Sequence, residues 1–236
     1  MASIYKDDLR GSKNPVNILK SVIYKTRFFR EHPGYFRPSG LLLFCGPQGS
    51  GKTLSAVSYV RKLSWQYPKA IICTNVDIQG LNPACQVVEY TGLYSLKYIN
   101  NSYYGVIYLI DEIHLEYNSL ESKNIDIEIM IEVSQQRKQR KHIIGTSQVY
   151  QRLAKPFREQ IKNIVLCRCF FGCVQWNTLI DGDTAKEENG KLKCKTIGRF
   201  LWFHQPALYD AYDTYAKMKR YNQEWQGRKR LTGGDM

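Results

Sequence analysis

The chain has 236 residues, of which 43% are hydrophobic and 23% charged, so it carries enough apolar material for a buried core. Its 34 Lys and Arg residues against 21 Asp and Glu give a net charge of +13, which favours a polyanionic partner, either nucleic acid or an anionic membrane surface. A basic surface without a specific partner is the alternative. No apolar stretch approaches the roughly 20 residues that cross a bilayer, and residues 1–10 lack the apolar core of a signal peptide, so we expect a cytoplasmic protein without an integral membrane segment.

Residues 1–39 interleave aromatic and basic side chains and are predicted to form an N-terminal extension, with an amphipathic helix over 17–30. Residues 40–212 are predicted to form one domain. Residues 213–236 are expected to begin as a helix and to end in the basic run 228–230.

From residue 41 onward, the pattern alternates between strand-like and helix-like segments. Apolar runs predict buried strands over 41–45 and 105–110, and 70–74 and 141–146 are further strand candidates. Helical spacing predicts helices over 53–65, 93–100 and 125–137. This alternation is typical of an α/β fold with a mostly parallel sheet covered by helices on both faces.

Three further strand-like runs follow without helices between them, at 164–171, 174–180 and 198–203. We expect these to be antiparallel strands added to the sheet after residue 163, with a hairpin turn at Phe171 and Gly172.

The strongest motif fits G-x-x-x-x-G-K-[ST] and lies between an apolar strand and a helix, as a phosphate-binding loop requires. Its candidate nucleotide-binding residues are Gly46, Pro47, Gln48, Gly49, Ser50, Gly51, Lys52 and Thr53. The glycines let backbone N–H groups point at phosphate oxygens, and the helix N-terminus adds positive potential there. Lys52 would reach the β- and γ-phosphates of ATP, and the Thr53 hydroxyl would ligate Mg²⁺.

Asp111 and Glu112 follow the apolar strand 106–110. In a nucleotide hydrolase, Asp111 would hold the Mg²⁺ ion and Glu112 would act as the general base toward water. A water-polarising Glu beside the metal-binding Asp favours hydrolysis over phosphoryl transfer to a small acceptor.

The strand predicted at 141–146 runs into Ser147 and Gln148. We interpret Gln148 as a sensor of the γ-phosphate or the attacking water, so that the catalytic set is Lys52, Glu112 and Gln148. The alternative is that Ser147 and Gln148 cap the following helix.

Four arginines are candidates to act on the nucleotide of a neighbouring subunit or to contact DNA phosphates: Arg137, Arg140, Arg152 and Arg158. The basic run at 137–141 is also compatible with a solvated helix end. The odd number of cysteines, 7, suits reduced thiols, and Cys167, Cys169 and Cys173 lack the spacing of a metal site. His114 could line the site or make a structural contact.

Five segments together resemble the ATPase domain of the zonular occludens toxin family, which is similar to the FtsK/HerA group of DNA-pumping motors. They are the phosphate loop, residues 107–112, the basic run 137–141, Thr146-Ser147-Gln148 and Leu208-Tyr209-Asp210. The resemblance covers roughly residues 40–212. It implies a P-loop NTPase of the additional-strand type, with one strand inserted between the loop strand and the acidic strand, which would place Gln148 between Lys52 and Glu112.

The resemblance also implies a ring, commonly a hexamer, that translocates DNA or drives virion assembly. Filamentous-phage members carry a membrane-spanning segment after the ATPase domain and this sequence shows none, which favours a genome-packaging motor with ATP and Mg²⁺ as cofactors and a capsid or portal protein as a further partner. We expect contacts to DNA phosphates rather than to bases. The alternatives are an assembly or extrusion ATPase acting on a membrane partner, and a nucleotide-dependent scaffold with little turnover.

Overall fold

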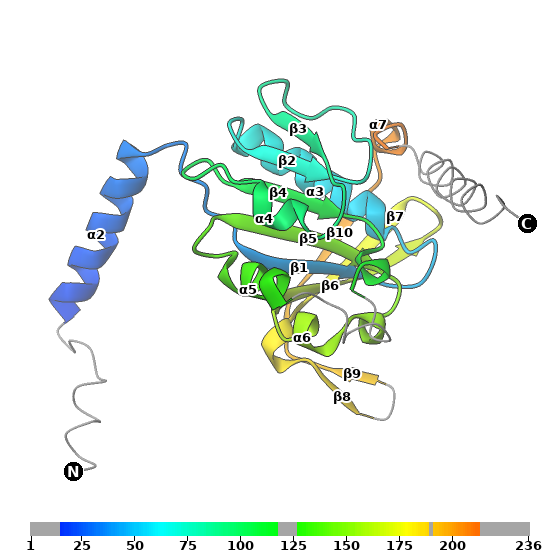
Figure 1. Cartoon of the computed structure of the whole chain (residues 1–236). Coiled ribbons are helices and arrows are strands. Elements are labelled where there is room, and N and C mark those ends of the chain that lie inside the picture. Colours follow the sequence, from blue (N-terminus) through cyan, green and yellow to red (C-terminus); the bar gives the residue numbers. More distant parts are fainter. Residues whose placement is uncertain (1–14, 118–126, 189–190, 213–236) are drawn as a thin grey trace, which may run out of the picture. The chain divides into compact units, whose positions relative to one another are not determined.

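The computed structural model describes residues 15–117, 127–188 and 191–212 (Figure 1). It divides the chain into two compact units, Met1–Tyr35 and Phe36–Met236. The helix and basic tail expected over 213–236 lie outside the described residues.

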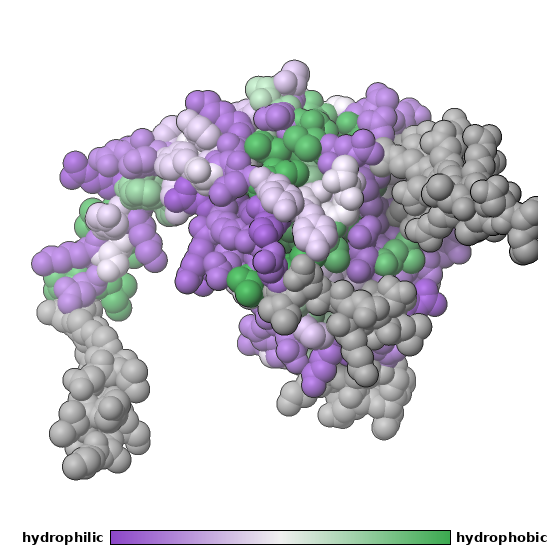
Figure 2. Space-filling model, viewed as in Figure 1, coloured by the Kyte–Doolittle hydropathy of each residue, from purple (hydrophilic) through white to green (hydrophobic). Residues whose placement is uncertain are grey.

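In the first unit, helix α2 spans Pro15–Glu31 and contains the predicted helical segment. Proline suits the first turn of a helix because its missing N–H would have no helical partner there. Apolar and basic side chains are mixed over the surface of this helix (Figure 2). Phe28 stacks on His32 with ring centroids 4.4 Å apart, and its edge meets Tyr35. These ring contacts order the end of the helix and the residues that follow it.

The second unit is built on an eight-stranded sheet with the order β10-β7-β6-β1-β5-β4-β2-β3. Its strands are β1 (Gly40–Cys45), β2 (Ile71–Thr74), β3 (Gln86–Glu89), β4 (Val106–Ile110), β5 (Lys141–Ser147), β6 (Ile161–Phe170), β7 (Val174–Asp181) and β10 (Thr196–Phe203). Strands β8 (Lys186–Glu188) and β9 (Lys191–Lys193) form a separate hairpin. The α-helices are α3 (Lys52–Gln66), α4 (Ser95–Tyr98), α5 (Ile127–Gln135), α6 (Lys155–Arg158) and α7 (Pro206–Tyr209). The described residues also form the 3-10 turns η1 (Ile113–Leu115), η3 (Tyr150–Arg152) and η4 (Gly182–Thr184).

Strand β5 lies between β1 and β4 and pairs in parallel with both. The register sets Cys45 of β1 opposite Ser147, and Ile110 of β4 opposite Gly145. The inserted strand that the resemblance implied is therefore confirmed. The carboxyl ends of β1, β5 and β4 meet at one edge of the sheet, which is where ligands bind in open α/β folds.

The later strands complete a mixed sheet, with one difference in detail from the sequence-based expectation. Strand β6 is itself parallel to β1, and the antiparallel pairing begins at β7, which pairs with both β6 and β10. The β6–β7 turn lies at the predicted place, where Phe171 and Gly172 have φ values of 54° and 71°. Two successive positive φ values match the twist of a tight hairpin.

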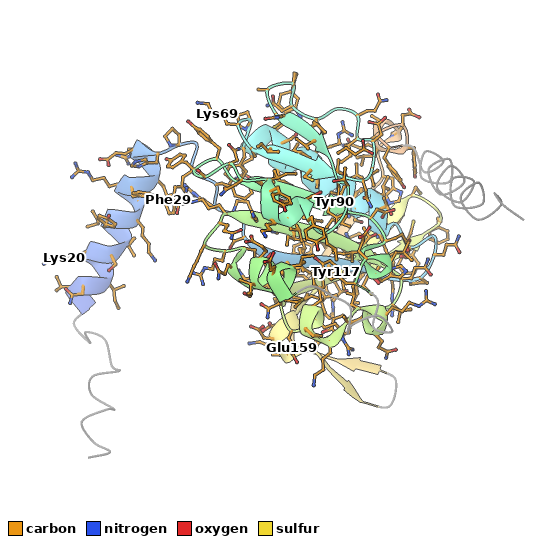
Figure 3. The ribbon with its side chains drawn as sticks, viewed as in Figure 1. Lys20, Phe29, Lys69, Tyr90, Tyr117 and Glu159 are labelled. Carbon is orange, nitrogen blue, oxygen red and sulfur yellow. The ribbon has the colours of Figure 1, made fainter. Side chains whose placement is uncertain are left out.

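Strand β4 shows how the core is divided between the two faces of the sheet, because all five of its residues are buried. Tyr108 and Ile110 belong to the cluster that includes residues of α4, α5 and α6. Ile107 and Leu109 point to the opposite face and pack with Val57 and other residues of α3. Tyr90 and Tyr117 lie in the first of these clusters (Figure 3). Within the described ranges, no helix is long and apolar enough to cross a membrane.

Candidate functional site

The glycine-rich loop begins directly after β1 and ends at the first turn of α3. Gly51 precedes the helix in the left-handed conformation, with a φ of 76°. The carbonyl of Pro47 accepts from the Ser50 N–H at 3.2 Å and from Lys52 Nζ at 2.9 Å. The Lys52 side chain therefore folds back over its own loop, where it is buried.

Two glycines of the loop are required by their surroundings. A Cβ at Gly46 would lie 2.7 Å from the carbonyl oxygen of Cys167, which is a backbone atom of β6. A Cβ at Gly51 would collide with the side-chain oxygen of Gln175 on β7. At Gly49, whose φ is 74°, there is nothing within 4 Å. The loop thus packs closely against β6 and β7 on one side and is open at Gly49.

The first acid after β4 contacts the loop helix and the inserted strand at the same carboxylate oxygen. The Thr53 hydroxyl donates to Asp111 Oδ1 at 2.9 Å, and the Thr146 hydroxyl donates to the same atom at 2.6 Å. Hydroxyl and carboxylate oxygens are the ligands that Mg²⁺ prefers in proteins. The structure therefore brings together Thr53 and Asp111, the two residues predicted to hold the ion.

Asn75, which follows β2, fixes the backbone of Asp111 from the other side. Its side-chain oxygen accepts from the Asp111 N–H at 2.8 Å, and its side-chain nitrogen donates to the Asp111 carbonyl at 3.1 Å. The sequence reasoning missed Asn75. The available signal was its position, as a polar residue directly after a buried strand of a parallel sheet.

Glu112 has a left-handed backbone with a φ of 56°, which is uncommon outside glycine. Its N–H donates to the Thr146 hydroxyl at 2.9 Å, so Thr146 touches both acids of the pair. Its Oε2 lies 3.2 Å from Nε2 of buried His114, whose Nδ1 lies 3.4 Å from the Ser147 hydroxyl. The backbone reversal explains how two adjacent acids are arranged at one strand end, since strand geometry would send them to opposite faces.

Gln148 lies at the carboxyl end of β5, between the ends of β1 and β4, as the strand order predicted. Its backbone carbonyl accepts from the Cys45 thiol at 3.8 Å, and the neighbouring Ser147 carbonyl accepts from the Gly46 N–H at 3.3 Å. The side chain is half-buried. Its role as a sensor stays a prediction.

The four candidate arginines are distributed over both ends of the sheet. Arg137 and Arg140 precede β5, whose seven residues separate its two ends by about 20 Å. Arg140 donates to the Ser102 carbonyl at 3.2 Å and lies over the Tyr103 ring. Arg152 is exposed and follows the carboxyl end of β5, the end that carries the loop. The Arg158 guanidinium lies over the Tyr150 ring, 5.5 Å from its centroid.

The cysteines are free thiols, and none of the described His, Cys, Asp and Glu side chains gather into a group that could hold a metal by themselves. Burial raises the pKa of the Cys167 thiol to about 12. This agrees with the interpretation of Cys167 as a buried structural thiol.

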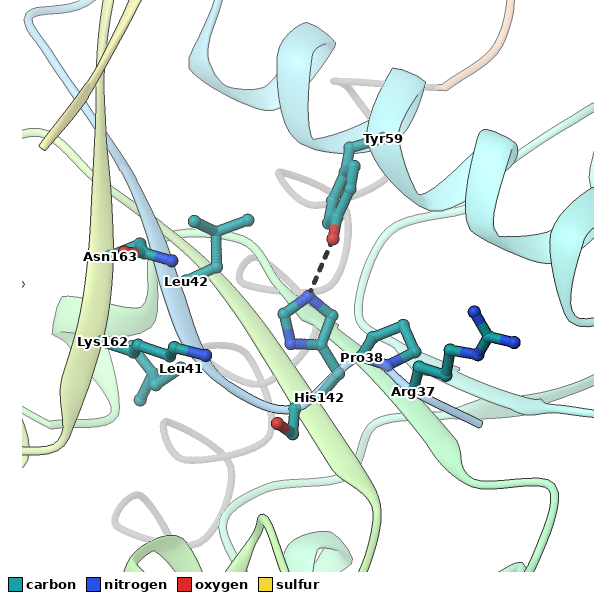
Figure 4. Close-up of a pocket in the computed structure, with 9 residues that line it drawn as sticks. Arg37, Pro38, Leu41, Leu42, Tyr59, His142, Lys162 and Asn163 are labelled. Atoms are coloured by element: carbon teal, nitrogen blue, oxygen red, sulfur yellow. Dashed lines mark hydrogen bonds between the residues drawn. The ribbon is translucent and has the colours of Figure 1, made fainter. Parts of the chain in front are cut away.

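A cavity of about 210 Å³ opens at the amino ends of β1 and β5, the sheet end opposite to the loop (Figure 4). His142 lies beside it and contacts the Tyr59 hydroxyl at 3.2 Å and the Gly40 carbonyl at 2.9 Å. Burial lowers the pKa of His142 to about 4. The ring is therefore neutral, with Nδ1–H donating to Gly40 and Nε2 accepting from Tyr59.

The loop residues fit a nucleotide phosphate with its magnesium ion. The Ser50 hydroxyl is buried and has no hydrogen-bond partner among the described residues, and it lies inside the loop. Such an orphaned group calls for a further partner. Together with the paired Thr53 and Asp111 oxygens, this set of donors and acceptors suits a phosphate and a hard divalent cation.

No protein-family profile and no curated protein matches this chain. The N-terminal domain of zonular occludens toxin from Neisseria meningitidis superposes with a TM-score of 0.53 at 16% identity, covering 75% of this chain and 100% of that one. The genome packaging NTPase B204 from Sulfolobus turreted icosahedral virus 2, in complex with ATP-gammaS, gives a TM-score of 0.46 at 12% identity over 67% of this chain and 97% of that one. The RadB recombinase gives 0.43 at 19% identity over 61% and 81%.

The likeness to the toxin domain confirms the fold that the sequence predicted. The glycine-rich loop after β1, the inserted β5 and the acidic end of β4 define a P-loop NTPase fold of the additional-strand type.

Proposed function

We propose that this chain is a Mg²⁺-dependent ATPase that moves DNA, as a viral genome-packaging motor does. The observation that carries the hydrolytic part is the 2.9 Å hydrogen bond from the Thr53 hydroxyl to Asp111 Oδ1. It joins the end of the phosphate loop to the acidic end of β4, and these are the two elements that must meet around a metal-bound phosphate.

Each residue has a distinct part in this proposal. The N–H groups of the loop and the Lys52 ammonium bind the phosphates, and Lys52 exchanges the Pro47 carbonyl for a phosphate oxygen. Thr53 and Asp111 would hold Mg²⁺, which neutralises charge on the phosphates when bound. Thr146 holds the Asp111 carboxylate in place through its 2.6 Å hydrogen bond.

Glu112 accepts a proton from the attacking water in this proposal. The side chain is 24% exposed and contacts His114, which is only 7% exposed. Partial exposure leaves the carboxylate accessible to water, while the buried histidine limits its movement. In this proposal Gln148, which follows the strand between the loop strand and the acidic strand, contacts the γ-phosphate.

The DNA part of the proposal rests on the net charge of +13 and on the resemblance stated from the sequence. Arg137 and Arg140 lie at the end of β5 far from the loop, so within one subunit a strand length of about 20 Å separates them from the loop end. We infer that they serve DNA or a neighbouring subunit of a ring. Arg152 is exposed and lies at the same end of the sheet as the loop. It is therefore the candidate arginine that could contact the nucleotide of its own subunit.

The Glu112→Gln variant tests the hydrolytic part. We expect it to bind a fluorescent ATP analogue with an affinity close to that of the unmodified chain and to lose steady hydrolysis by at least about 100-fold, the range in which a general base contributes. Glu116→Gln, at an exposed position nearby, is the matched control and should hydrolyse ATP normally. Undiminished turnover by Glu112→Gln would overturn the assignment.

The DNA part is tested by following hydrolysis as a function of salt with and without duplex DNA. Contacts to phosphates release counterions, so DNA stimulation should fall steeply as salt rises. A combined Arg137→Glu and Arg140→Glu variant should lose stimulation while keeping its basal rate. Stimulation that is independent of salt would contradict a phosphate-binding surface.

A further inference from the structure

A buried amide on β7 contacts the phosphate loop from outside the motif. Gln175 has no exposed surface, and its Nε2 donates to the Ser50 carbonyl at 2.9 Å. The same nitrogen donates to the side-chain oxygen of Asn177 at 2.8 Å, and Asn177 in turn donates to the Ser55 hydroxyl of α3 at 3.2 Å. Both amides therefore point from β7 toward the loop and its helix.

The contact with Ser50 fixes the orientation of one peptide unit of the loop. In a planar trans peptide, the carbonyl of Ser50 and the N–H of Gly51 point in opposite directions. Because Gln175 holds the carbonyl, the Gly51 N–H is directed away from β7. Within the described residues this N–H makes no backbone hydrogen bond of its own. A donor fixed in this way is preorganised for an anion.

The Gln175 side chain is itself held by a relay that reaches the surface. Its Oε1 lies 3.1 Å from His204 Nε2, which must carry the proton because the amide oxygen only accepts. With Nε2 protonated, His204 Nδ1 is an acceptor and lies 2.9 Å from the Tyr209 hydroxyl, whose single proton is shared between Nδ1 and the Gly172 carbonyl oxygen 2.8 Å away. Gly172 belongs to the exposed β6–β7 turn.

We propose that Gln175 is a positioning residue of the phosphate loop, oriented by His204 and Tyr209, and that it sets nucleotide affinity by fixing the peptide between Ser50 and Gly51. The inference rests on the proposed function, because it assigns the loop to phosphate. It also gives Tyr209, which belongs to the Leu-Tyr-Asp segment of the sequence resemblance, a physical role. A collision of any Cβ at Gly51 with Gln175 shows how closely the two are fitted.

The test compares Gln175→Leu with Gln136→Leu, which removes another buried glutamine amide at the distant end of β5. For both variants we would measure the Kd for a fluorescent ATP analogue with Mg²⁺, the melting temperature, and the ¹H–¹⁵N resonance of Gly51 with and without ATP. Gln175→Leu should raise the Kd about tenfold, which corresponds to about 1.4 kcal/mol. It should also broaden or shift the Gly51 resonance before ATP is added. Gln136→Leu should change neither the Kd nor the Gly51 resonance.

A second variant covers the case in which Gln175→Leu folds poorly. His204 is half-exposed, and His204→Ala removes only the contact to the amide oxygen of Gln175. The Kd of this variant for the ATP analogue should therefore rise less than that of Gln175→Leu, by about threefold. A Kd and a Gly51 resonance equal to those of the unmodified chain in a folded Gln175 or His204 variant would overturn the inference while leaving the proposed function intact. Failure of the unmodified chain to bind the ATP analogue would instead overturn the proposed function.

Discussion

The Thr53 hydroxyl and Asp111 Oδ1 are joined by a 2.9 Å hydrogen bond, although the residues come from different elements, α3 and the end of β4. The parallel sheet causes this proximity, because β5 sets the carboxyl ends of β1 and β4 at one edge.

Thr53→Val removes the hydroxyl and keeps the shape of the side chain. We expect the affinity for ATP in the presence of Mg²⁺ to weaken about tenfold, or ~1.4 kcal/mol, because one oxygen ligand of the ion is lost. Affinity measured in EDTA should change little, since the loop N–H groups and Lys52 remain. Thr53→Ser restores the hydroxyl and should restore the magnesium effect, and equal losses with and without the ion would contradict the ligand role.

Gly49 and Gly51 provide a matched pair, because their φ values are 74° and 76° and their surroundings differ. Alanine at Gly49 introduces only the backbone strain of a left-handed conformation, so we expect a loss of about 1–2 kcal/mol in the free energy of unfolding. Alanine at Gly51 should lose more, because its Cβ meets Gln175. Adding Gln175→Ala to Gly51→Ala should recover part of the difference in urea unfolding. Equal losses at both glycines would show that the loop does not pack on β7.

Asn75→Leu removes both hydrogen bonds to the Asp111 backbone. Leaving these partly buried groups unpaired should lower the free energy of unfolding by about 2 kcal/mol, and the ATP hydrolysis rate should fall because Asp111 is no longer held. Gln79→Leu, at an exposed position, is the control for introducing leucine. Full activity of Asn75→Leu would mean that the β4 end is held by Thr146 and Thr53 alone.

His142 predicts how stability depends on pH. Burial, with a smaller effect of Lys162, lowers its pKa in the folded chain to about 4, against 6.5 when exposed. The unfolded chain therefore binds more protons between these values, and stability should fall as the pH drops from 6.5 toward 4, by roughly 3 kcal/mol in all. In urea unfolding at pH 7 and pH 4.5, His142→Gln should show a smaller difference than the unmodified chain. His32→Gln should retain the full difference, and an unchanged difference in His142→Gln would assign the effect to other groups.

The sequence predicted the elements whose patterns are strongest. The runs at 41–45 and 106–110 are continuously apolar because both sheet faces are covered, and each became a strand, as did the predicted segment 141–146. Strand β3 was not predicted, because it lies at the sheet edge and its residues are mostly exposed, which leaves no apolar run. Residues 164–171 were expected to be antiparallel, and β6 instead pairs in parallel with β1. Helix α6 and the turns beside it return the chain to the amino end of the sheet before β6 begins, and this short crossover has no clear helical pattern.

Some residues of the candidate site could likewise be predicted from the sequence and others could not. Lys52, Thr53 and Asp111 could be predicted because loop and acid occur in a known order along the chain, and the structure brings them together. Thr146 and Asn75 were not assigned roles: Thr146 lies within β5, and the position of Asn75 directly after β2 is a signal that does not by itself name the partner of its side chain. Gln175 could not be found from sequence, since its contact with Ser50 depends on the pairing of β6 and β7 beside β1.

Steady-state ATP hydrolysis with Mg²⁺, measured with and without duplex DNA at low salt, tests the central claim most directly. We predict measurable turnover by the unmodified chain, an increase on adding DNA, and turnover at least about 100-fold lower in both conditions for Glu112→Gln. A chain that binds ATP and fails to hydrolyse it with or without DNA would contradict the account, and so would hydrolysis that Glu112→Gln leaves unchanged.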